Sequence, residues 1–206
     1  MGVFVTEDHM GMVEQLAKDA REGCREYIDW LERRYTVRRR SSRKLPVVAF
    51  LGWGHCGKDT AADYWAKIYE MTVDAATSRV VSPLVAWALG ASNESVYEAR
   101  HEDRQFWYQF CHHLREQDPV TLVRWVLGSS DVVVGVRADY ELAESVKAGL
   151  IDLTVWVDRP GTAADPTVDF TAEDCDIVIN NDKGLEEYYG KLTRLGDTLR
   201  LPKRNL

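Results

Sequence analysis

The segment from Pro46 to Thr60 constrains the fold of this chain more than any other. It begins with Pro46-Val-Val-Ala-Phe-Leu51, a short continuous apolar run. Such a run is typical of a strand that is covered on both faces of a parallel sheet. A glycine-rich turn follows, and then a predicted helix from Asp59 to about Met71. A strand that turns through glycines into a helix begins a βαβ unit, so we expect a parallel sheet.

The same alternation of strand and helix recurs downstream. Helices are predicted at about 140–148 and from near Leu185, on the spacing of their apolar residues. Three further apolar runs predict strands, at 131–136, 153–157 and 177–179. Strands that alternate with helices predict an α/β fold with three layers and a parallel sheet.

A helical insertion of about residues 83–127 separates the first two of these strands. It is expected to break near Gly90 and again at Asp118-Pro119. An Asp at the N-cap and a Pro at the first helical position are signals of a new helix. We therefore predict a helix that begins at Pro119.

The N-terminal region is predicted to form an extension of the main domain. Apolar residues recur every three or four positions from Glu7 to about Tyr35 and form one stripe of a long amphipathic helix. The basic stretch Val37–Lys44 is interpreted as a solvated linker. A domain boundary is predicted near Lys44, which divides residues 1–44 from a domain at 45–206. The apolar stripe must pack on another surface, so the helix could dock on a partner or form a homodimer.

Composition excludes several classes of protein. The 206 residues are 45% hydrophobic and 29% charged, as in ordinary globular proteins. No apolar run approaches the roughly 18 residues of a membrane helix, and the first residues lack the basic region of a secretory signal. The four cysteines have no disulfide-like or zinc-like spacing. We therefore expect a cytoplasmic protein with reduced thiols and no membrane partner.

The net charge of −7 disfavours a dedicated nucleic-acid binder. The charge is unevenly distributed, because seven of the 26 basic residues lie between Arg33 and Lys44 with no acidic residue among them. DNA binding through segment 33–44 therefore stays open.

The glycine turn has the spacing of a phosphate-binding loop, or P-loop. Gly52 to Lys58 matches G-x-x-x-x-G-K, and it lies between a strand and a helix as the motif requires. Backbone N–H groups and the helix N-terminus attract phosphate, and Lys58 adds a cation toward the β and γ phosphates. We predict that ATP binds here with Mg²⁺. The residues predicted to bind it in this segment are Gly52, Trp53, Gly54, His55, Cys56, Gly57, Lys58, Asp59 and Thr60.

The residues around this loop resemble one kinase family. Asp59 stands where the usual motif has Ser or Thr, and Gly57-Lys-Asp-Thr60 followed by Ala-Ala-Asp-Tyr64 resembles the deoxynucleoside monophosphate kinases of phages. Later segments resemble that family's strands in the same order, so the resemblance covers about residues 46–195. It implies a P-loop NTPase fold and ATP-dependent transfer to a (deoxy)nucleoside monophosphate, giving the diphosphate. If the protein is phage-encoded, it would act in the host cytoplasm.

The chain departs from the family pattern at one strand end. The family carries an Asp after the apolar strand, whereas this sequence has Gly135. The Mg²⁺ ligand is therefore predicted to be Asp59 or Glu141, although Asp59 equally suits a helix cap.

Arginines in the insertion are predicted to bind the acceptor. Arg100, Arg104 and Arg115 would share one face if residues 98–116 formed a single helix. Phosphoryl transfer between two anions requires such cations, although a solvated face paired with nearby acids is the alternative. The resemblance favours Arg104 and Arg115, because the related kinases have substrate-binding arginines in this insertion.

Further candidates follow the ends of the predicted strands, where ligands of open α/β sheets bind. Arg137 is predicted to contact phosphate, and Arg159 to clamp or stack on the nucleotide base. Asn181 lies where related kinases hold adenine, although a plain turn explains it as well. The predicted catalytic residues are Lys58, Arg104, Arg115 and Arg137.

Three functions stay open on these residues. The first is a nucleoside monophosphate kinase. The second is a kinase that acts on a hydroxyl of DNA or on a modified base in DNA, with the basic segment 33–44 following the phosphate backbone. The third is a nucleotide-binding module without catalysis, which the Gly135 departure permits.

Overall fold

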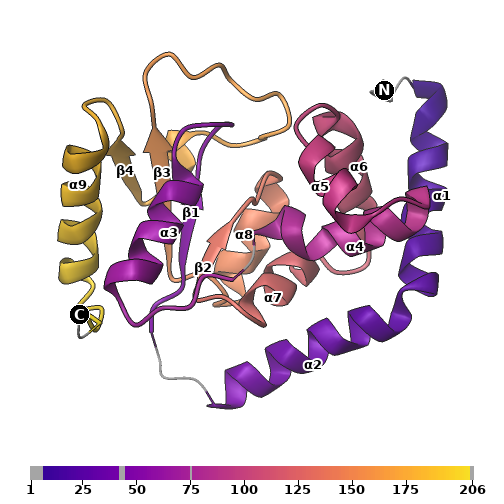
Figure 1. The fold of residues 1–206 in the computed structure, drawn as a ribbon, viewed down its shortest axis with the longest axis horizontal. Coiled ribbons are helices and arrows are strands. Elements are labelled where there is room, and N and C mark those ends of the chain that lie inside the picture. Colours follow the sequence, from indigo (N-terminus) through magenta and orange to yellow (C-terminus); the bar gives the residue numbers. More distant parts are fainter. Residues whose placement is uncertain (1–6, 42–44, 75, 205–206) are drawn as a thin grey trace.

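The computed structural model describes residues 7–41, 45–74 and 76–204, in which helices enclose a parallel sheet (Figure 1). All four predicted strands are confirmed, and they pair in parallel in the order β2-β1-β3-β4. Ala49 at the centre of the sheet pairs with Val133 on one side and Thr154 on the other. The strands are β1 (Val48–Leu51), β2 (Val132–Val134), β3 (Leu153–Asp158) and β4 (Ile177–Asn180).

Helices make up most of the remaining described chain. Those predicted to begin near Asp59, Tyr140 and Leu185 are confirmed as α3, α8 and α9. In chain order the helices are α1 (Glu7–Gly23), α2 (Arg25–Ser41), α3 (Lys58–Ile68), α4 (Thr77–Leu89), α5 (Asn93–Ala99), α6 (Arg104–Arg115), α7 (Thr121–Leu127), α8 (Asp139–Lys147), the short 3-10 helix η1 (Ala172–Asp174) and α9 (Leu185–Thr198).

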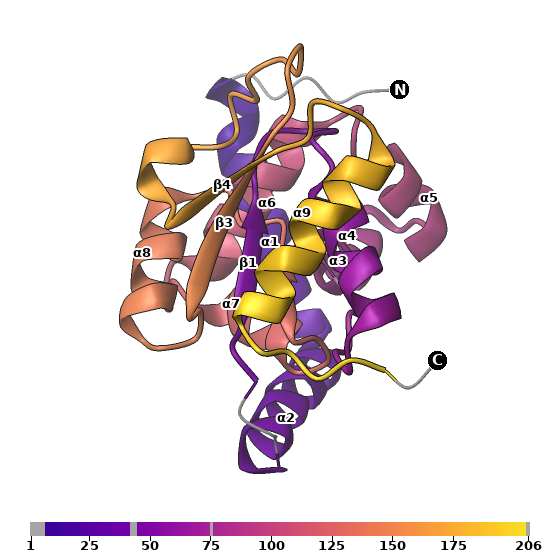
Figure 2. The same cartoon turned by 90° about the vertical axis from the view of Figure 1, so that its left-hand side faces the viewer.

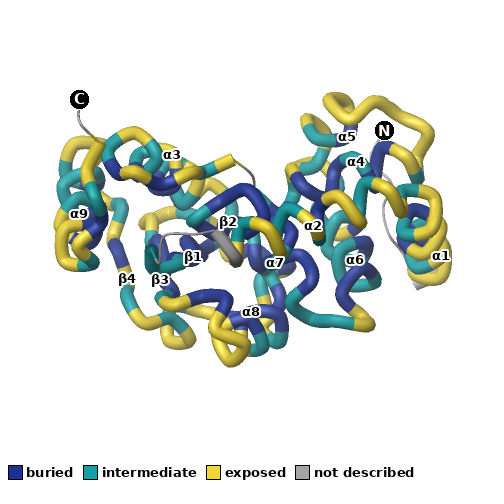
Figure 3. The backbone as a smooth tube through the Cα atoms, turned by 90° about the horizontal axis from the view of Figure 1, so that it is seen from below, coloured by how far each residue is buried: buried dark blue, intermediate teal, exposed yellow. Residues whose placement is uncertain are grey.

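The sheet has a separate hydrophobic core on each face, which confirms the predicted three layers. Successive side chains of a strand point to opposite faces. Val48 and Phe50 of β1 therefore pack with the helices α3 and α9, whereas Ala49 and Leu51 pack with the helical insertion, α7 and α8. Figure 2 shows α3 and α9 on one side of the sheet and α8 on the other. In Figure 3, β1 and α7 are largely buried, while α1 and α9 expose their outer sides.

The predicted single N-terminal helix is wrong, because the chain bends at Cys24 between α1 and α2. Gly23 ends α1 against the indole of Trp87, where a Cβ atom would overlap the ring. The two helices then run in different directions, α1 along one end of the molecule and α2 beneath the sheet (Figure 1). The periodic apolar stripe does not reveal this bend, since its spacing continues through it.

The solvated linker predicted at Val37–Lys44 is also wrong over residues 37–41, where helix α2 continues to Ser41. Arg38 forms an ion pair with Asp131 at 2.6 Å, so its charge is neutralised against the body of the protein. Arg43 and Lys44, together with the boundary predicted near Lys44, lie outside the described residues.

The N-terminal helices share the core of the rest of the protein. Val13, Ala17 and Ala20 of α1 are at most 2% exposed and belong to the same cluster as Ala49 of the sheet. Helix α1 packs against α4 and α6, and α2 packs against α7. The apolar stripe predicted in this region therefore covers the helical insertion.

The insertion contains four helices with boundaries that differ from those predicted. Helix α4 begins at Thr77, so Pro83 lies inside it, and the predicted break at Gly90 is confirmed by a left-handed C-cap. Helix α7 begins at Thr121 instead of Pro119, and the Thr121 N–H closes a tighter turn before it by donating to the Asp118 carbonyl at 3.2 Å. The Asp118 carboxylate accepts from the Val120 N–H, as an N-cap does, and pairs with Arg124.

Residues 98–116 do not form a single helix, so the condition for Arg100, Arg104 and Arg115 to share one face is not met. Helix α5 ends at Ala99, and α6 begins only at Arg104. The Asp103 side chain accepts a hydrogen bond from the Phe106 N–H at 3.3 Å and so caps α6. Arg100 therefore lies in a turn, and the three arginines do not share one helical face.

Candidate functional site

The segment Gly52–Gly57, called the glycine loop below, connects the central strand β1 to α3. Gly52 and Gly57 have φ values of +134° and +109°, which side chains rarely adopt. A Cβ at Gly52 would lie 2.7 Å from the Val157 carbonyl oxygen, and one at Gly57 would lie 2.6 Å from Asn181 Nδ2. Glycine is therefore required at both ends of the loop.

Neighbouring elements hold the outer side of the glycine loop. Asn181 Nδ2 donates to the Cys56 carbonyl at 2.8 Å, and the Tyr188 hydroxyl donates to the Gly57 carbonyl at 3.0 Å. Arg159 donates to the His55 carbonyl at 3.3 Å. Arg159 and Asn181, predicted to bind nucleotide, thus contact the backbone of the loop. Cys56 is buried, and burial raises the pKa of its thiol, which suits a packing role.

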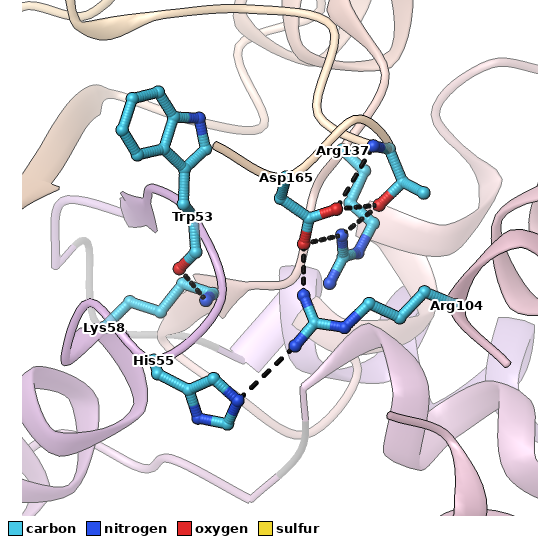
Figure 4. Close-up of polar contacts among 7 residues, drawn as sticks. Trp53, His55, Lys58, Arg104, Arg137 and Asp165 are labelled. Atoms are coloured by element: carbon cyan, nitrogen blue, oxygen red, sulfur yellow. Dashed lines mark hydrogen bonds and ion pairs between the residues drawn. The ribbon is translucent and has the colours of Figure 1, made fainter. Parts of the chain in front are cut away.

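The inner side of the glycine loop presents positive charge. No side chain caps the N-terminus of α3, so its first N–H groups are available to an anion. Lys58, the first residue of α3, bends back over the loop and donates from Nζ to the Trp53 carbonyl at 3.0 Å (Figure 4). A helix N-terminus and a lysine therefore converge at the same place.

A cavity opens beside Lys58 and Asp59, at the carboxyl edge of the sheet. The end of β2 forms part of its wall through Val134 and Gly135, and Thr77 at the start of α4 forms another part. Side chains from α5, α6 and the turn between them complete it. The aromatic members are Tyr97, Trp107 and Tyr108, and the arginines are Arg100, Arg104, Arg115 and Arg137. Four arginines and a lysine on one cavity make it strongly attractive to anions.

Two of these arginines converge on one carboxylate, as Figure 4 shows. Arg104 and Arg137 both donate from Nη1 to Asp165 Oδ2, the latter at 2.9 Å. Asp165 is almost completely buried. Burial by itself raises the pKa of Asp165, but hydrogen bonds from Thr167 and the nearby Arg137 outweigh it and bring this pKa well below its usual range. Asp165 therefore stays ionised as the counter-ion of both arginines.

Arg115 forms a buried ion pair with Glu141 at the floor of the cavity. The two side chains are 2% and 0% exposed. Arg115 Nε also donates to the Tyr140 hydroxyl at 3.1 Å, whereas its Nη2 has no partner among the described residues. Burial raises the pKa of Glu141 to about 7, although the neighbouring Arg115 lowers it. Within the described chain, Glu141 accepts a hydrogen bond from Arg115. The role of Glu141 as a magnesium ligand stays a prediction.

Gly135 has a steric explanation. Its φ is +101°, and a Cβ there would lie 3.3 Å from the Thr77 side chain. The Thr77 hydroxyl donates to the Val134 carbonyl at 3.2 Å, so Thr77 is itself held against the strand end. A residue with an acidic side chain does not suit this position.

The structure brings most predicted site residues to one edge of the sheet. Lys58, Asp59, Arg104, Arg115 and Arg137 line the cavity. A neighbouring cavity is lined by Gly54, His55, Arg104, Arg159 and residues 160–166. Thr60, Asn181 and Glu141 line neither.

Sequence reasoning missed Asp165. It lies in the β3–β4 loop, residues 159–176, in a stretch of Gly, Ala and Pro. The Asp-Pro-Thr sequence at 165–167 is a turn signal, and it is the local feature that could have drawn attention to Asp165.

Comparison of the sequence with known protein families and with curated proteins found no match. In residues 7–41, 45–74 and 76–204, no helix is long and apolar enough to cross a membrane. The same residues contain no cluster of three or more His, Cys, Asp or Glu side chains placed to hold a metal ion.

Proposed function

We propose that this protein transfers the γ-phosphoryl group of ATP to a nucleoside monophosphate, in particular a deoxynucleotide. One observation carries the proposal: Lys58 and the uncapped N-terminus of α3 open onto the cavity that the four arginines line. Phosphoryl transfer requires mainly that two polyanions be brought together and their charge neutralised. The glycine loop would be a P-loop that holds the donor.

The donor side is supported by the chemistry of the glycine loop. Its positive-φ glycines bring backbone close to a ligand, and the first N–H groups of α3 have no side-chain cap. Lys58 Nζ would exchange the Trp53 carbonyl for phosphate oxygens, which are stronger acceptors. Arg159 and Asn181 shape the loop from outside and lie near where the nucleoside would extend.

The acceptor side is supported by the arginines and aromatic rings of the cavity. Arg115 Nη2 is buried and without a partner in the described chain, which leaves a donor for a phosphate oxygen. The ring of Tyr97 is held between Arg79 and Arg100, whose guanidinium carbons lie 3.8 and 3.9 Å from its centroid. Together with Trp107, this stack offers a surface for a base.

Magnesium fits the site through one carboxylate. In such sites Mg²⁺ is usually held by one or two carboxylates together with substrate phosphates and water. Asp59 is the carboxylate among the cavity-lining residues, so it would hold the ion. When bound, Mg²⁺ neutralises charge on the phosphates. Glu141 would instead keep Arg115 in place.

A kinase that acts on DNA is the main alternative. Two basic residues of α2 pair with acids at the amino edge of the sheet, Arg38 with Asp131 and Arg34 with Asp74. The cavity lies at the carboxyl edge, which supports a free monophosphate as acceptor. Removing residues 1–44 is no clean test of DNA binding, because it would also remove Val13 and its buried neighbours from the core.

A panel assay tests the proposal. ADP release by the purified protein with MgATP would be measured for each common ribo- and deoxynucleoside monophosphate. We expect at least one monophosphate to stimulate ADP release well above the rate without acceptor. ATP binding without stimulation by any monophosphate would contradict the proposal and favour a nucleotide-binding module.

A further inference from the structure

The Asp165 side chain is held by hydrogen bonds within its own loop, in addition to its contacts with the arginines. Its Oδ1 accepts from the Thr167 N–H at 3.1 Å and from the Thr167 hydroxyl at 2.6 Å. These bonds close a local turn around Pro166. They direct the other oxygen, Oδ2, toward Arg104 and Arg137 (Figure 4).

The two arginines come from separate elements and have like charges. Arg104 is the first residue of α6, whereas Arg137 follows β2. Guanidinium groups that share one oxygen would repel each other without the carboxylate between them. The Asp165 side chain is only 2% exposed, so water does little to screen these interactions. The carboxylate therefore holds the two cations together.

We propose that Asp165 is a positioning residue that holds Arg104 and Arg137 as a pair facing the phosphates. This inference rests on the proposed kinase function and deepens it. Among the described residues, the hydrogen bonds of the Arg137 guanidinium all involve Nη1, which leaves Nε and Nη2 for a ligand. Both arginines line the cavity beside Lys58, where the donor and acceptor phosphates would meet.

The anchoring of the β3–β4 loop distinguishes this role from that of a plug that a phosphate displaces. The Asp169 N–H donates to the Arg137 carbonyl at 2.9 Å, and the Tyr108 hydroxyl donates to the Asp169 carboxylate at 2.6 Å. Arg159 ties the start of the loop to the glycine loop. These three contacts anchor the β3–β4 loop, and the bonds to Thr167 fix the Asp165 carboxylate within it. Asp165 is therefore held in place as a support for the two arginines.

The two roles predict opposite effects of Asp165→Asn on anion binding. A plug competes with the ligand, so its neutralisation would tighten binding. A positioning residue orients the arginines, so its neutralisation weakens binding. We would measure calorimetrically the affinity of the full-length protein for inorganic tripolyphosphate, which resembles the donor's phosphate chain. We expect Asp165→Asn to weaken it about tenfold, as loss of a charge-assisted contact does. Unchanged or tighter binding would overturn the proposal.

A double-mutant cycle tests whether Asp165 acts through the arginines. In a variant that already carries Arg104→Gln and Arg137→Gln, we expect Asp165→Asn to change tripolyphosphate affinity less than about twofold. A full tenfold effect in that background would show that Asp165 acts independently of the arginines. The matched control is Glu173→Gln, which removes one exposed charge from the same loop and should bind as the wild type does.

Turnover provides the second readout. We expect Asp165→Asn to lower kcat about 30-fold or more and to raise the KM for ATP by no more than the roughly tenfold loss expected for tripolyphosphate, because Lys58 and the glycine loop remain intact. A rise in KM with kcat unchanged would contradict a positioning role. If the wild type transfers no phosphoryl group, the proposed function fails, whereas tripolyphosphate binding still decides the role of Asp165.

A second variant guards against misfolding. If circular dichroism shows that Asp165→Asn is unfolded, Thr167→Val replaces it, because that change removes only the hydroxyl that holds the carboxylate and contacts Arg137. We expect it to weaken tripolyphosphate binding about threefold. Wild-type affinity in a folded Thr167→Val protein would overturn the proposal.

Discussion

Arginines gather at both edges of the parallel sheet, but their surroundings differ. At the amino edge, Arg38 pairs with Asp131 and Arg34 with Asp74, while Arg39 lies over the ring of Tyr35. At the carboxyl edge, four arginines line one cavity beside Lys58. The number of basic residues in a segment therefore does not by itself indicate where phosphate would bind. The carboxyl edge is distinguished because its cavity also receives Lys58 and the uncapped N-terminus of α3, whereas the cavity beside Arg38 and Arg39 at the amino edge is lined by the acids Asp131 and Asp152.

The direction of the sheet explains why the two edges differ. In a parallel sheet the helices that follow the strands begin at the carboxyl edge, and their N-termini attract anions. Helix α3 begins there, directly after the glycine loop. The basic end of α2 instead meets residues that precede the strands, such as Val47 and Asp131. Its arginines also suit the negative C-terminal end of their own helix.

The largest expected effect comes from the carboxyl edge, in Lys58→Ala. We expect kcat/KM for the proposed phosphoryl transfer to fall about 1,000-fold, because the cation that we propose faces the transferring group is lost. Steady-state kinetics would measure it, with Lys67→Ala as the control, since Lys67 lies exposed on the same helix. An equal loss of kcat/KM in Lys58→Ala and Lys67→Ala would contradict a specific role for Lys58.

The next effect compares buried and surface ion pairs at the two edges. Arg115→Met leaves Glu141 buried without its partner, so we expect a loss of about 3 kcal/mol in the free energy of unfolding. Arg38→Met breaks a partly exposed pair with Asp131, and we expect a loss below about 1 kcal/mol. Urea unfolding measures the free energy of unfolding of both variants. Similar losses in the two would contradict the difference between the buried and the partly exposed ion pair.

A smaller effect concerns the pH dependence of stability. The folded-state pKa of Asp165 is depressed, so its contribution to stability is present above the ordinary carboxyl pKa near 3.8 and is lost as the pH falls below it. The difference in stability between the wild type and Asp165→Asn should therefore become smaller as the pH is lowered toward 2. Thermal unfolding at several pH values measures this gap. A gap that widens on acidification would contradict the depressed pKa.

Local sequence signals were sufficient for the strands and for the glycine loop. Apolar runs such as 46–51 and 131–136 need no distant partner to be recognised, because each is bounded by turn residues. The glycine loop is likewise local, since two glycines, a lysine and the flanking strand and helix lie within a few residues. The sheet and the position of Lys58 could therefore be predicted.

Long-range contacts determined what could not be predicted. The bend at Cys24 depends on packing of Gly23 against Trp87, and the helical state of residues 37–41 accompanies the pairing of Arg38 with Asp131. Asp165 lies 61 residues from Arg104 in sequence, so no short motif connects them.

The cavity arginines were predicted on reasoning that the structure corrects. Arg100, Arg104 and Arg115 share a face only if residues 98–116 form one helix, whereas a turn between α5 and α6 brings Arg100 to the cavity that Arg104 and Arg115 reach from the two ends of α6. The residues meet because of the fold of the insertion, which helical periodicity alone does not describe.

The most direct test compares one arginine from each edge in a single assay. Transfer of label from γ-labelled ATP to the nucleoside monophosphate that the panel identifies would be followed in Arg137→Gln and Arg38→Gln. We expect Arg137→Gln to reduce the rate of label transfer at least about 100-fold and Arg38→Gln to change it less than about twofold. Equal rates in the two variants, or a greater loss in Arg38→Gln, would contradict a phosphoryl-transfer site at the carboxyl edge.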